Sequence, residues 1–362
     1  MIVVRLALPL VVVLAGPGLG LDAPAAKTAG PVGNAAARVN APSPTANRVR
    51  VADLSLNPAI AIAGEKVTVR AKIVNESDQS YSAIDWTLDV GGPKPAPVSG
   101  KIALATGGSE SIETSFTVSG EQDVDVTLSV DPTGALGEPM AQRADNSVRA
   151  KLVVVPNATD TYSMSARKLG SFANRYLEDA RPRTCVEGEV DATTLVVKRL
   201  SIAALRGNVA TTVPGVDATL ATAFGKALDE AYKTWTSQYT ATVAGAYPSF
   251  GAWPGPRAPA TPNVPFPLTA GGSYTGTQAW HVATLETSLK NKLGAAIAQP
   301  GASAAVKNLA RAASLQFTTW TSMRSIANVV ASGEVPSFGQ SAPTGAVRNG
   351  RIEKREPCSH LL

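Results

Sequence analysis

Residues 66–75 read KVTVRAKIVN, and in them Val67, Val69, Ala71 and Ile73 alternate with polar side chains. A period of two places one face of a β-strand in a core and the other face in water. The stretch therefore predicts an amphipathic strand, and the same pattern extends in both directions from it.

Further strands of this kind are separated by turn-forming Gly, Asn, Asp and Pro residues. About seven strands over about 105 residues are typical of a two-sheet antiparallel sandwich. The six strands expected besides the first lie at residues 51–56, 84–90, 101–104, 112–118, 124–130 and 148–154.

Four segments of this region carry a family resemblance: VADLSLNPAIAIAGEKVTVRAKIVN, the Trp-bearing IDWTLDVGG, TGGSESIETSFTV, and VTLSVDPTGALGE with the later ADNSVRAKLVV. The Val-Asp-Pro-x-Gly-x-x-x-Glu element, followed by Asn146, is the most specific of them. With these motifs, residues 48–155 resemble a CARDB-type module, an immunoglobulin-like or fibronectin-III-like sandwich of bacterial surface proteins. The resemblance implies an accessory, spacing or adhesive role without chemistry of its own.

The first 20 residues, MIVVRLALPLVVVLAGPGLG, have the layout of a secretory signal peptide. Arg5 precedes the apolar run at 6–15, and small residues follow it. We expect cleavage after Gly20, with Ala25 as the alternative. The other interpretation is an uncleaved anchor, which the short run disfavours because a spanning helix needs about 20 apolar residues. We therefore expect a secreted, cell-surface or periplasmic protein with no membrane span after cleavage.

Residues 21–47 are rich in Ala, Pro, Gly, Ser, Thr and Asn and have no hydrophobic period. Such a composition predicts a flexible linker. We expect the sandwich to occupy residues 48–156 and a second domain to occupy residues 157–362.

The second half shows a helical period of three to four residues. Residues 191–210 are compatible with either a helix or a strand, whereas Asp217 is a good N-cap for a long helix. The sequence thus predicts a multi-domain β + α protein whose second domain is all-α. Its helices are expected at residues 159–180, 217–244, 277–298 and 303–332.

An internal repeat occurs in this half, because TWTS is found at 234–237 and again at 319–322. Phe224 and Leu309 each stand eleven residues before the repeated Trp, and Pro-Ser-Phe-Gly follows each copy. This similarity predicts a duplicated unit in which large aromatic groups form the core between helices. The two units are residues 217–251 and 303–339, with core residues Phe224, Trp235, Leu309 and Trp320.

The segment between the copies, residues 248–267, is rich in proline and is expected to form an extended strap over the helices. Tyr247, Phe250 and Trp253 are spaced by three, which places them on one side of such a strap. They form either a strip that binds sugar rings or a partner peptide, or plugs that fix the strap to the core, and we favour the plugs.

Cys185 and Cys358 are the two cysteines of the chain. An even pair in an exported protein predicts a disulfide, here one that ties the basic tail to the second domain. The alternative is two free thiols in a cytoplasmic protein, which the signal peptide disfavours.

The charge balance limits the partners, because 33 Lys and Arg oppose 28 Asp and Glu for a net charge of +5. This surplus is too small for a nucleic-acid footprint. Only two histidines are present, His281 and His360, and neither lies in a catalytic motif. We therefore assign no catalytic residue and expect no cofactor.

Two acidic groups are candidates for chemistry: Glu187, Glu189 and Asp191, and Asp123, Asp125, Asp131 and Glu138. Paired carboxylates can hydrolyse glycosides, and oxygen ligands suit Ca²⁺. Because no ligand loop of the required spacing is present, solvated strand and turn residues are the simpler interpretation, and we expect no metal.

These observations favour an exported, non-enzymatic binding or structural protein, in an adhesion-like or assembly role. A protein or glycan at the cell surface is the expected partner, with self-assembly as a close variant. The alternative from another class is a secreted hydrolase that carries the immunoglobulin-like domain as an accessory module.

Overall fold

The computed structural model describes residues 48–92, 97–139, 143–202, 213–247, 253, 255–269, 272–273, 275–335, 347–352, 358 and 360–362. The described residues belong to one compact unit, residues 40–362. The predicted signal peptide at 1–20, the whole predicted linker at 21–47, Phe250 and both Pro-Ser-Phe-Gly motifs lie outside the described residues.

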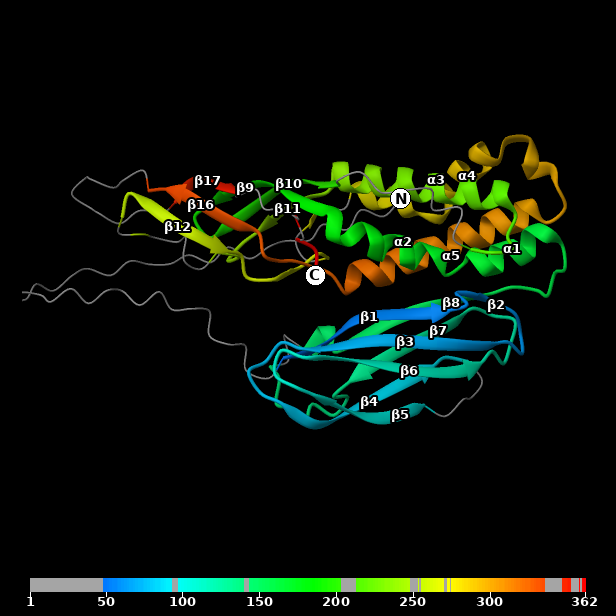
Figure 1. The fold of residues 1–362 in the computed structure, drawn as a ribbon, viewed down its shortest axis with the longest axis horizontal. Coiled ribbons are helices and arrows are strands. Elements are labelled where there is room, and N and C mark those ends of the chain that lie inside the picture. Colours follow the sequence, from blue (N-terminus) through cyan, green and yellow to red (C-terminus); the bar gives the residue numbers. More distant parts are fainter. Residues whose placement is uncertain are drawn as a thin grey trace, which may run out of the picture. The chain divides into compact units, whose positions relative to one another are not determined.

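Within its described residues, the N-terminal sandwich has eight strands: the seven that the alternating pattern predicts and the short β2 (Figure 1). One sheet has the order β1-β3-β6, and the other has the order β2-β8-β7-β4-β5. The strands are β1 Val49–Asn57, β2 Ile60–Ala61, β3 Lys66–Asn75, β4 Tyr81–Val90, β5 Val98–Leu104, β6 Ser109–Thr117, β7 Val124–Val130 and β8 Ser147–Val154. All neighbouring strands are antiparallel except β2 and β8, which are parallel.

The most specific sequence element of the sandwich lies in the connection between β7 and β8. The Asp131 carboxylate accepts hydrogen bonds from the backbone N–H groups of Ala135 at 2.8 Å and Leu136 at 3.1 Å. Glu138 is buried and accepts a hydrogen bond of 2.6 Å from the Asn146 amide. The conformation of this connection thus depends on Asp, Glu and Asn acting as local hydrogen-bond partners.

The second half contains five α-helices and a large sheet, so the prediction of an all-α domain is wrong. The seven-stranded antiparallel sheet has the order β12-β16-β17-β9-β10-β11-β14, and β13 pairs with β15 separately. The helices are α1 Thr161–Leu169, α2 Phe172–Ala180, α3 Ala218–Gln238, α4 Val282–Leu293 and α5 Ala302–Ser322. The strands are β9 Thr184–Asp191, β10 Thr194–Ile202, β11 Thr240–Val243, β12 Arg257–Pro262, β13 Phe266–Pro267, β14 Gly272–Ser273, β15 Ser325–Ile326, β16 Val330–Glu334 and β17 Arg348–Ile352.

The first predicted helix, 159–180, is divided into α1 and α2 at Gly170. A Cβ atom on Gly170 would lie 2.8 Å from Cγ1 of Ile60, a residue of the sandwich. The glycine therefore permits a close approach between the end of α1 and β2. Ser171 reinforces this contact, because its hydroxyl accepts a hydrogen bond of 3.2 Å from the Ala59 N–H.

The two long helices of the predicted repeat are both 21 residues long. Asp217 caps α3 as predicted, since its carboxylate accepts a hydrogen bond of 2.8 Å from the Leu220 N–H. Both helices end earlier than the sequence suggests, and each is followed by strands of the second half (Figure 1). The helical spacing of apolar residues did not show where each helix ends, because a strand begins within a few residues of its last turn.

The repeated tryptophans meet in one aromatic cluster. Trp235 and Trp320 are both buried, with ring centroids 5.9 Å apart in an edge-to-face arrangement. Phe224 and Leu309, the other two residues assigned to the repeat core, are also fully buried. The duplication itself stays a prediction.

Part of the Pro-rich segment joins the sheet and does not lie over the helices as a strap. Strand β12 forms one edge of the seven-stranded sheet and pairs only with β16. An edge position tolerates proline, which has no N–H to donate to a second neighbour.

Cys185 of β9 and Cys358 are joined by a disulfide, with their Cα atoms 5.3 Å apart. The segment at 360–362 is held next to the bond. The His360 Nδ1 atom accepts a hydrogen bond of 3.0 Å from the Val186 N–H, and Leu362 exchanges two backbone hydrogen bonds with Ser325. The tail is therefore attached both covalently and by its hydrogen bonds.

We expect reduction of this disulfide to lower the free energy of unfolding by about 2–4 kcal/mol, because the bond constrains the unfolded chain. Thermal denaturation with and without a reductant measures the effect. The Cys185→Ser/Cys358→Ser double variant is the control, and its midpoint should not respond to the reductant. Two thiols that react with an alkylating reagent in the native oxidised protein would contradict the pairing.

The sandwich and the second half share side chains between their cores. Met323, directly after α5, lies in the hydrophobic core of the sandwich. In return, Ile60, Val153 and Val155 lie in the hydrophobic core of the second half. Helix α5 runs beside β1 and β8 (Figure 1), and the exchanged side chains fix it there.

Candidate functional site

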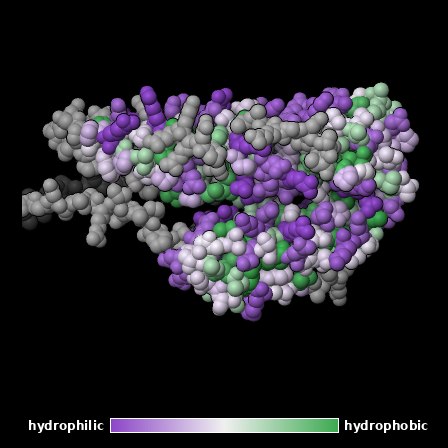
Figure 2. All heavy atoms as spheres, viewed as in Figure 1, coloured by the Kyte–Doolittle hydropathy of each residue, from purple (hydrophilic) through white to green (hydrophobic). Residues whose placement is uncertain are grey.

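Two adjoining cavities lie between α5 and the β1–β8 side of the sandwich, with volumes of about 750 and 200 Å³. They share Ala150, Lys151, Leu315 and Thr319, so together they form one extended groove along α5. Hydrophilic side chains gather where the helices meet the sandwich (Figure 2). We call this space the α5 groove.

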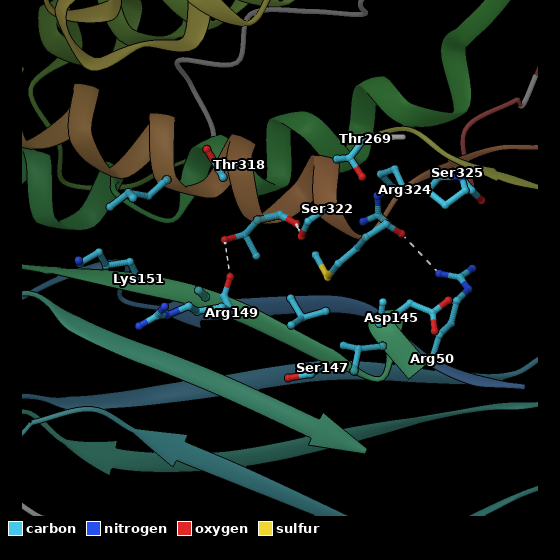
Figure 3. A pocket seen from close by; sticks show the side chains of 18 of the residues that line it. Arg50, Asp145, Ser147, Arg149, Lys151, Thr269, Thr318, Ser322, Arg324 and Ser325 are labelled. Carbon is cyan, nitrogen blue, oxygen red and sulfur yellow. Dashed lines mark hydrogen bonds between the residues drawn. The ribbon is translucent and has the colours of Figure 1, made fainter. Parts of the chain in front are cut away.

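Strand β8 provides the floor of the α5 groove. Its alternation directs Val148, Ala150 and Leu152 toward buried positions, while Arg149 and Lys151 remain more exposed. The two cations extend below α5 toward the same side (Figure 3). They share one carboxylate, Asp125 of β7, at 3.0 Å from Arg149 and 3.6 Å from Lys151.

Helix α5 provides the opposite wall, and its groove-facing side chains are mainly hydroxyls. The Thr319 hydroxyl donates a hydrogen bond of 3.1 Å to the Arg149 carbonyl, which ties the helix to β8 (Figure 3). Thr318 and Ser322 donate to carbonyls of α5 itself, those of Ser314 at 3.0 Å and Thr319 at 2.7 Å. The oxygens of Thr318 and Ser322, both exposed, thus keep lone pairs that can accept a hydrogen bond from a ligand.

One end of the α5 groove is bounded by a network of ion pairs. Arg48 contacts Glu76 at 3.2 Å and Asp145 at 2.8 Å, and Arg50 contacts Glu76 at 2.5 Å. Arg50 also reaches the Met323 carbonyl at 3.5 Å (Figure 3). In this network two carboxylates balance two arginines, so this end carries no surplus of charge.

A buried ion pair lies behind the groove wall. Arg324 is only 4% exposed, pairs with Glu178 of α2 and donates a hydrogen bond of 2.7 Å to the Ala52 carbonyl of β1. The Trp320 indole donates to the same Glu178 carboxylate at 2.8 Å, and the Arg324 guanidinium lies 5.5 Å from the Trp320 ring centroid. Burial lowers the pKa of Arg324. This cluster links β1, α2 and the end of α5.

Asp53 of β1 lies close to the same cluster. Burial raises the pKa of its carboxyl, and the negative charge of Glu178 raises it further, against the opposing effect of Arg324. Within the described ranges, Asp53 Oδ1 has no hydrogen-bond partner. The ionised form of Asp53 is therefore costly in the folded protein.

We expect Asp53→Asn to be more stable than the natural protein at neutral pH. A raised folded-state pKa contributes stability below the unfolded pKa, and this contribution is lost as pH rises through the folded pKa. The difference between the variant and the natural protein should thus be small in acid, below about pH 4, and should grow toward pH 7. Urea unfolding across this pH range measures it.

Asp89→Asn, at an exposed position of the sandwich strand β4, is the matched control and should give little difference at any pH. A variant of Asp53 that is less stable than the natural protein at pH 7 would show that attraction to Arg324 outweighs the cost of burial.

Two of the three residues of the predicted aromatic strip, Tyr247 and Trp253, lie within the described residues. Tyr247 is fully buried and donates a hydrogen bond of 2.8 Å to the Val329 carbonyl. Trp253 is half-buried against the core of the second half, and Phe250 lies outside the described residues. The choice between a binding strip and plugs stays a prediction.

The two acidic groups are engaged in local interactions. Glu187 and Glu189 of β9 pair with Arg199 and Lys198 of the neighbouring β10. Asp123 pairs with Arg311 and accepts a hydrogen bond from the Val154 N–H at 3.1 Å. In the part of the chain that the structure describes, no group of three or more His, Cys, Asp or Glu side chains has the arrangement of a metal site.

The α5 groove was not predicted, because its two walls come from distant parts of the sequence. Thr319 and Arg149, which form a hydrogen bond across it, are 170 positions apart. One local signal was available. Ser147, Arg149 and Lys151 occupy the polar face of the last sandwich strand, and two cations on one strand face indicate a possible anion site.

Comparison with solved structures gives matches to the sandwich fold. The CARDB domain of a Pyrococcus furiosus protein, in complex with di-metal ions, is 12% identical over 30% of this chain and 94% of its own length, with a TM-score of 0.27. A domain of a Methanosarcina acetivorans protein assigned to the cell surface is 19% identical over 31% of this chain and 97% of its own, with a TM-score of 0.25.

A third match is a β-glucosidase from Listeria innocua in complex with glucose, 17% identical over 31% of this chain and 16% of the enzyme, with a TM-score of 0.21. No family model matches the sequence, and no curated protein matches it either. The strand order and the core of residues 49–154 define the sandwich. Over about 30% of its length the chain is similar to solved CARDB domains, the family that the sequence motifs of the sandwich resemble.

None of the helices within the described ranges combines the length and the hydrophobicity that a membrane crossing requires.

Proposed function

We propose that this chain is an exported, non-enzymatic binding protein of the cell surface or extracellular space, and that it binds its partner in the α5 groove. The observation that carries the proposal is the construction of the groove. One wall is a sandwich strand and the other is a helix, and the two are held together by exchanged core side chains and by the Arg324 cluster. A rigid, preformed groove reduces the entropy that a ligand loses on binding.

The charges of the groove favour binding over catalysis. Arg48, Arg50 and Arg324 are held in ion pairs with Glu76, Asp145 and Glu178. A proton-transfer group needs a pKa close to the working pH and a free position beside the substrate, whereas these side chains are fixed to one another. The disulfide supports export, because such bonds persist in oxidising compartments.

A glycan array and a pull-down from cell-envelope material, both with the full mature chain, test the proposal. The internal repeat provides a matched pair of variants. Ser322 lies in the groove and Ser237 is the equivalent position on α3; both are exposed, and each donates a hydrogen bond to the carbonyl three residues earlier. Ser322→Trp should fill the groove and abolish binding, and Ser237→Trp should bind normally.

Retained binding by folded Ser322→Trp protein would place the partner elsewhere and overturn the proposal. Release of shorter sugars from a bound glycan would favour the secreted hydrolase.

A further inference from the structure

The lining of the α5 groove carries an excess of positive charge. Lys151 lines both cavities, and Arg149 stands two residues before it on β8. The two cations share the single carboxylate of Asp125. Arg175 of α2, exposed and lining the smaller cavity, adds a third cation, and it forms no ion pair with any described residue. Outside its balanced ion pairs, the lining of the groove thus holds three cations and one carboxylate, which leaves a charge of about +2 for a ligand to neutralise.

The hydroxyl groups of α5 add a second chemical requirement. Thr318 and Ser322 are exposed and already donate their protons to carbonyls of α5, so their oxygens face a ligand mainly as hydrogen-bond acceptors. A ligand that complements them carries hydroxyl donors. A ligand that complements Arg149 and Lys151 carries anionic groups. Because the two cavities adjoin and form one extended groove, a ligand that fills both is a chain that carries both kinds of group.

From this combination we propose that the partner bound in the α5 groove is an acidic polysaccharide, a hydroxyl-rich chain that bears carboxylate or other anionic groups. The inference rests on the proposed function. Carboxylates take charge-assisted hydrogen bonds from Arg149 and Lys151, and sugar hydroxyls donate to the α5 oxygens.

A single-stranded nucleic acid is the competing polyanion, and the lining of the groove disfavours it. Such ligands are held by stacking of their bases on aromatic side chains. Among the described residues that line the two cavities, none is aromatic. The walls therefore suit a chain that is recognised through charges and hydroxyl groups.

The experiment is a titration of the full mature chain with four probes: an oligogalacturonate, dextran sulfate, neutral dextran and poly(U). The test variant is Arg149→Gln/Lys151→Gln. The control is Lys198→Gln/Arg199→Gln, which removes the same two charges from a strand outside the groove, where both side chains are also exposed and ion-paired. Exposed ion pairs contribute little to stability, so both variants should fold, and their thermal midpoints verify this.

We expect the oligogalacturonate or dextran sulfate to bind in preference to neutral dextran and poly(U), more weakly as salt rises. The test variant should lose about tenfold or more in affinity, while the control keeps its affinity.

Four results would overturn the acidic class. Neutral dextran that binds equally well, with no effect of the test variant, would leave the groove as the site but show that its ligand is uncharged. Preferred binding of poly(U) would identify the polyanion as a nucleic acid. If no acidic probe binds, but another glycan binds the natural protein and not the Ser322→Trp variant, the acidic class fails and the proposed function stands. If Ser322→Trp blocks nothing that binds, both fail.

Discussion

Arg324→Ala is expected to lower the free energy of unfolding by about 2–3 kcal/mol, because a buried cation and its hydrogen bonds are lost. The loss has two parts. Glu178, which is part-exposed, would keep only Arg181 as its ion-pair partner, and the Ala52 carbonyl would lose its hydrogen bond from the guanidinium. Urea denaturation followed by tryptophan fluorescence measures the change and also reports on Trp320, over which the guanidinium lies.

Arg70→Ala is the matched control, because Arg70 and Glu113 form an ion pair of 2.9 Å with both side chains well exposed. Exposed pairs contribute about 0–1 kcal/mol, so this variant should unfold almost as the natural protein does. If the two variants lose equal free energy of unfolding, Arg324 is hydrated in solution. Its cluster would then not hold β1 and α2 together.

Trp235→Ala should have a larger effect, with a loss of about 3–5 kcal/mol for a large core aromatic side chain. Trp235 is buried at the centre of the cluster between the helices. Its ring centroid lies 5.3 Å from those of Tyr232 and Phe317 and 5.9 Å from that of Trp320. Truncation to alanine leaves a cavity that these rings cannot fill without leaving their edge-to-face arrangement.

Trp253→Ala removes the same side chain from a half-buried position and should cost clearly less than Trp235→Ala in the same chemical denaturation. A larger loss at Trp253 would show that the Pro-rich segment, and not the α3–α5 cluster, dominates stability.

The sandwich was predictable because its signal is local. Each strand alternates on its own, as residues 66–75 do, and burial on β3 follows that alternation residue by residue. The Asp217 cap and the pairing of the two cysteines were predictable for the same reason, since one residue type in one context is sufficient for each.

The sheet of the second half was not predicted, because its strands are stabilised by pairing with segments that are distant in the sequence. Strand β17, with the sequence RNGRI, reads as part of a basic tail, yet it lies between β16 and β9 in the sheet. The groove was missed in the same way. Nothing near Lys151 in the sequence shows that Thr319 stands opposite, because tertiary pairing overrides local pattern.

Met323 in the sandwich core has a consequence for the order of folding. Arg324, the next residue, hydrogen-bonds to Ala52, which lies 272 residues earlier in the chain. A chain that emerges with its N-terminus first exposes all eight sandwich strands long before Met323 is available. We therefore expect the sandwich core to be complete only after Met323 has docked, and contacts of such long range slow folding. The same step brings α5 into its final position beside β1 and β8.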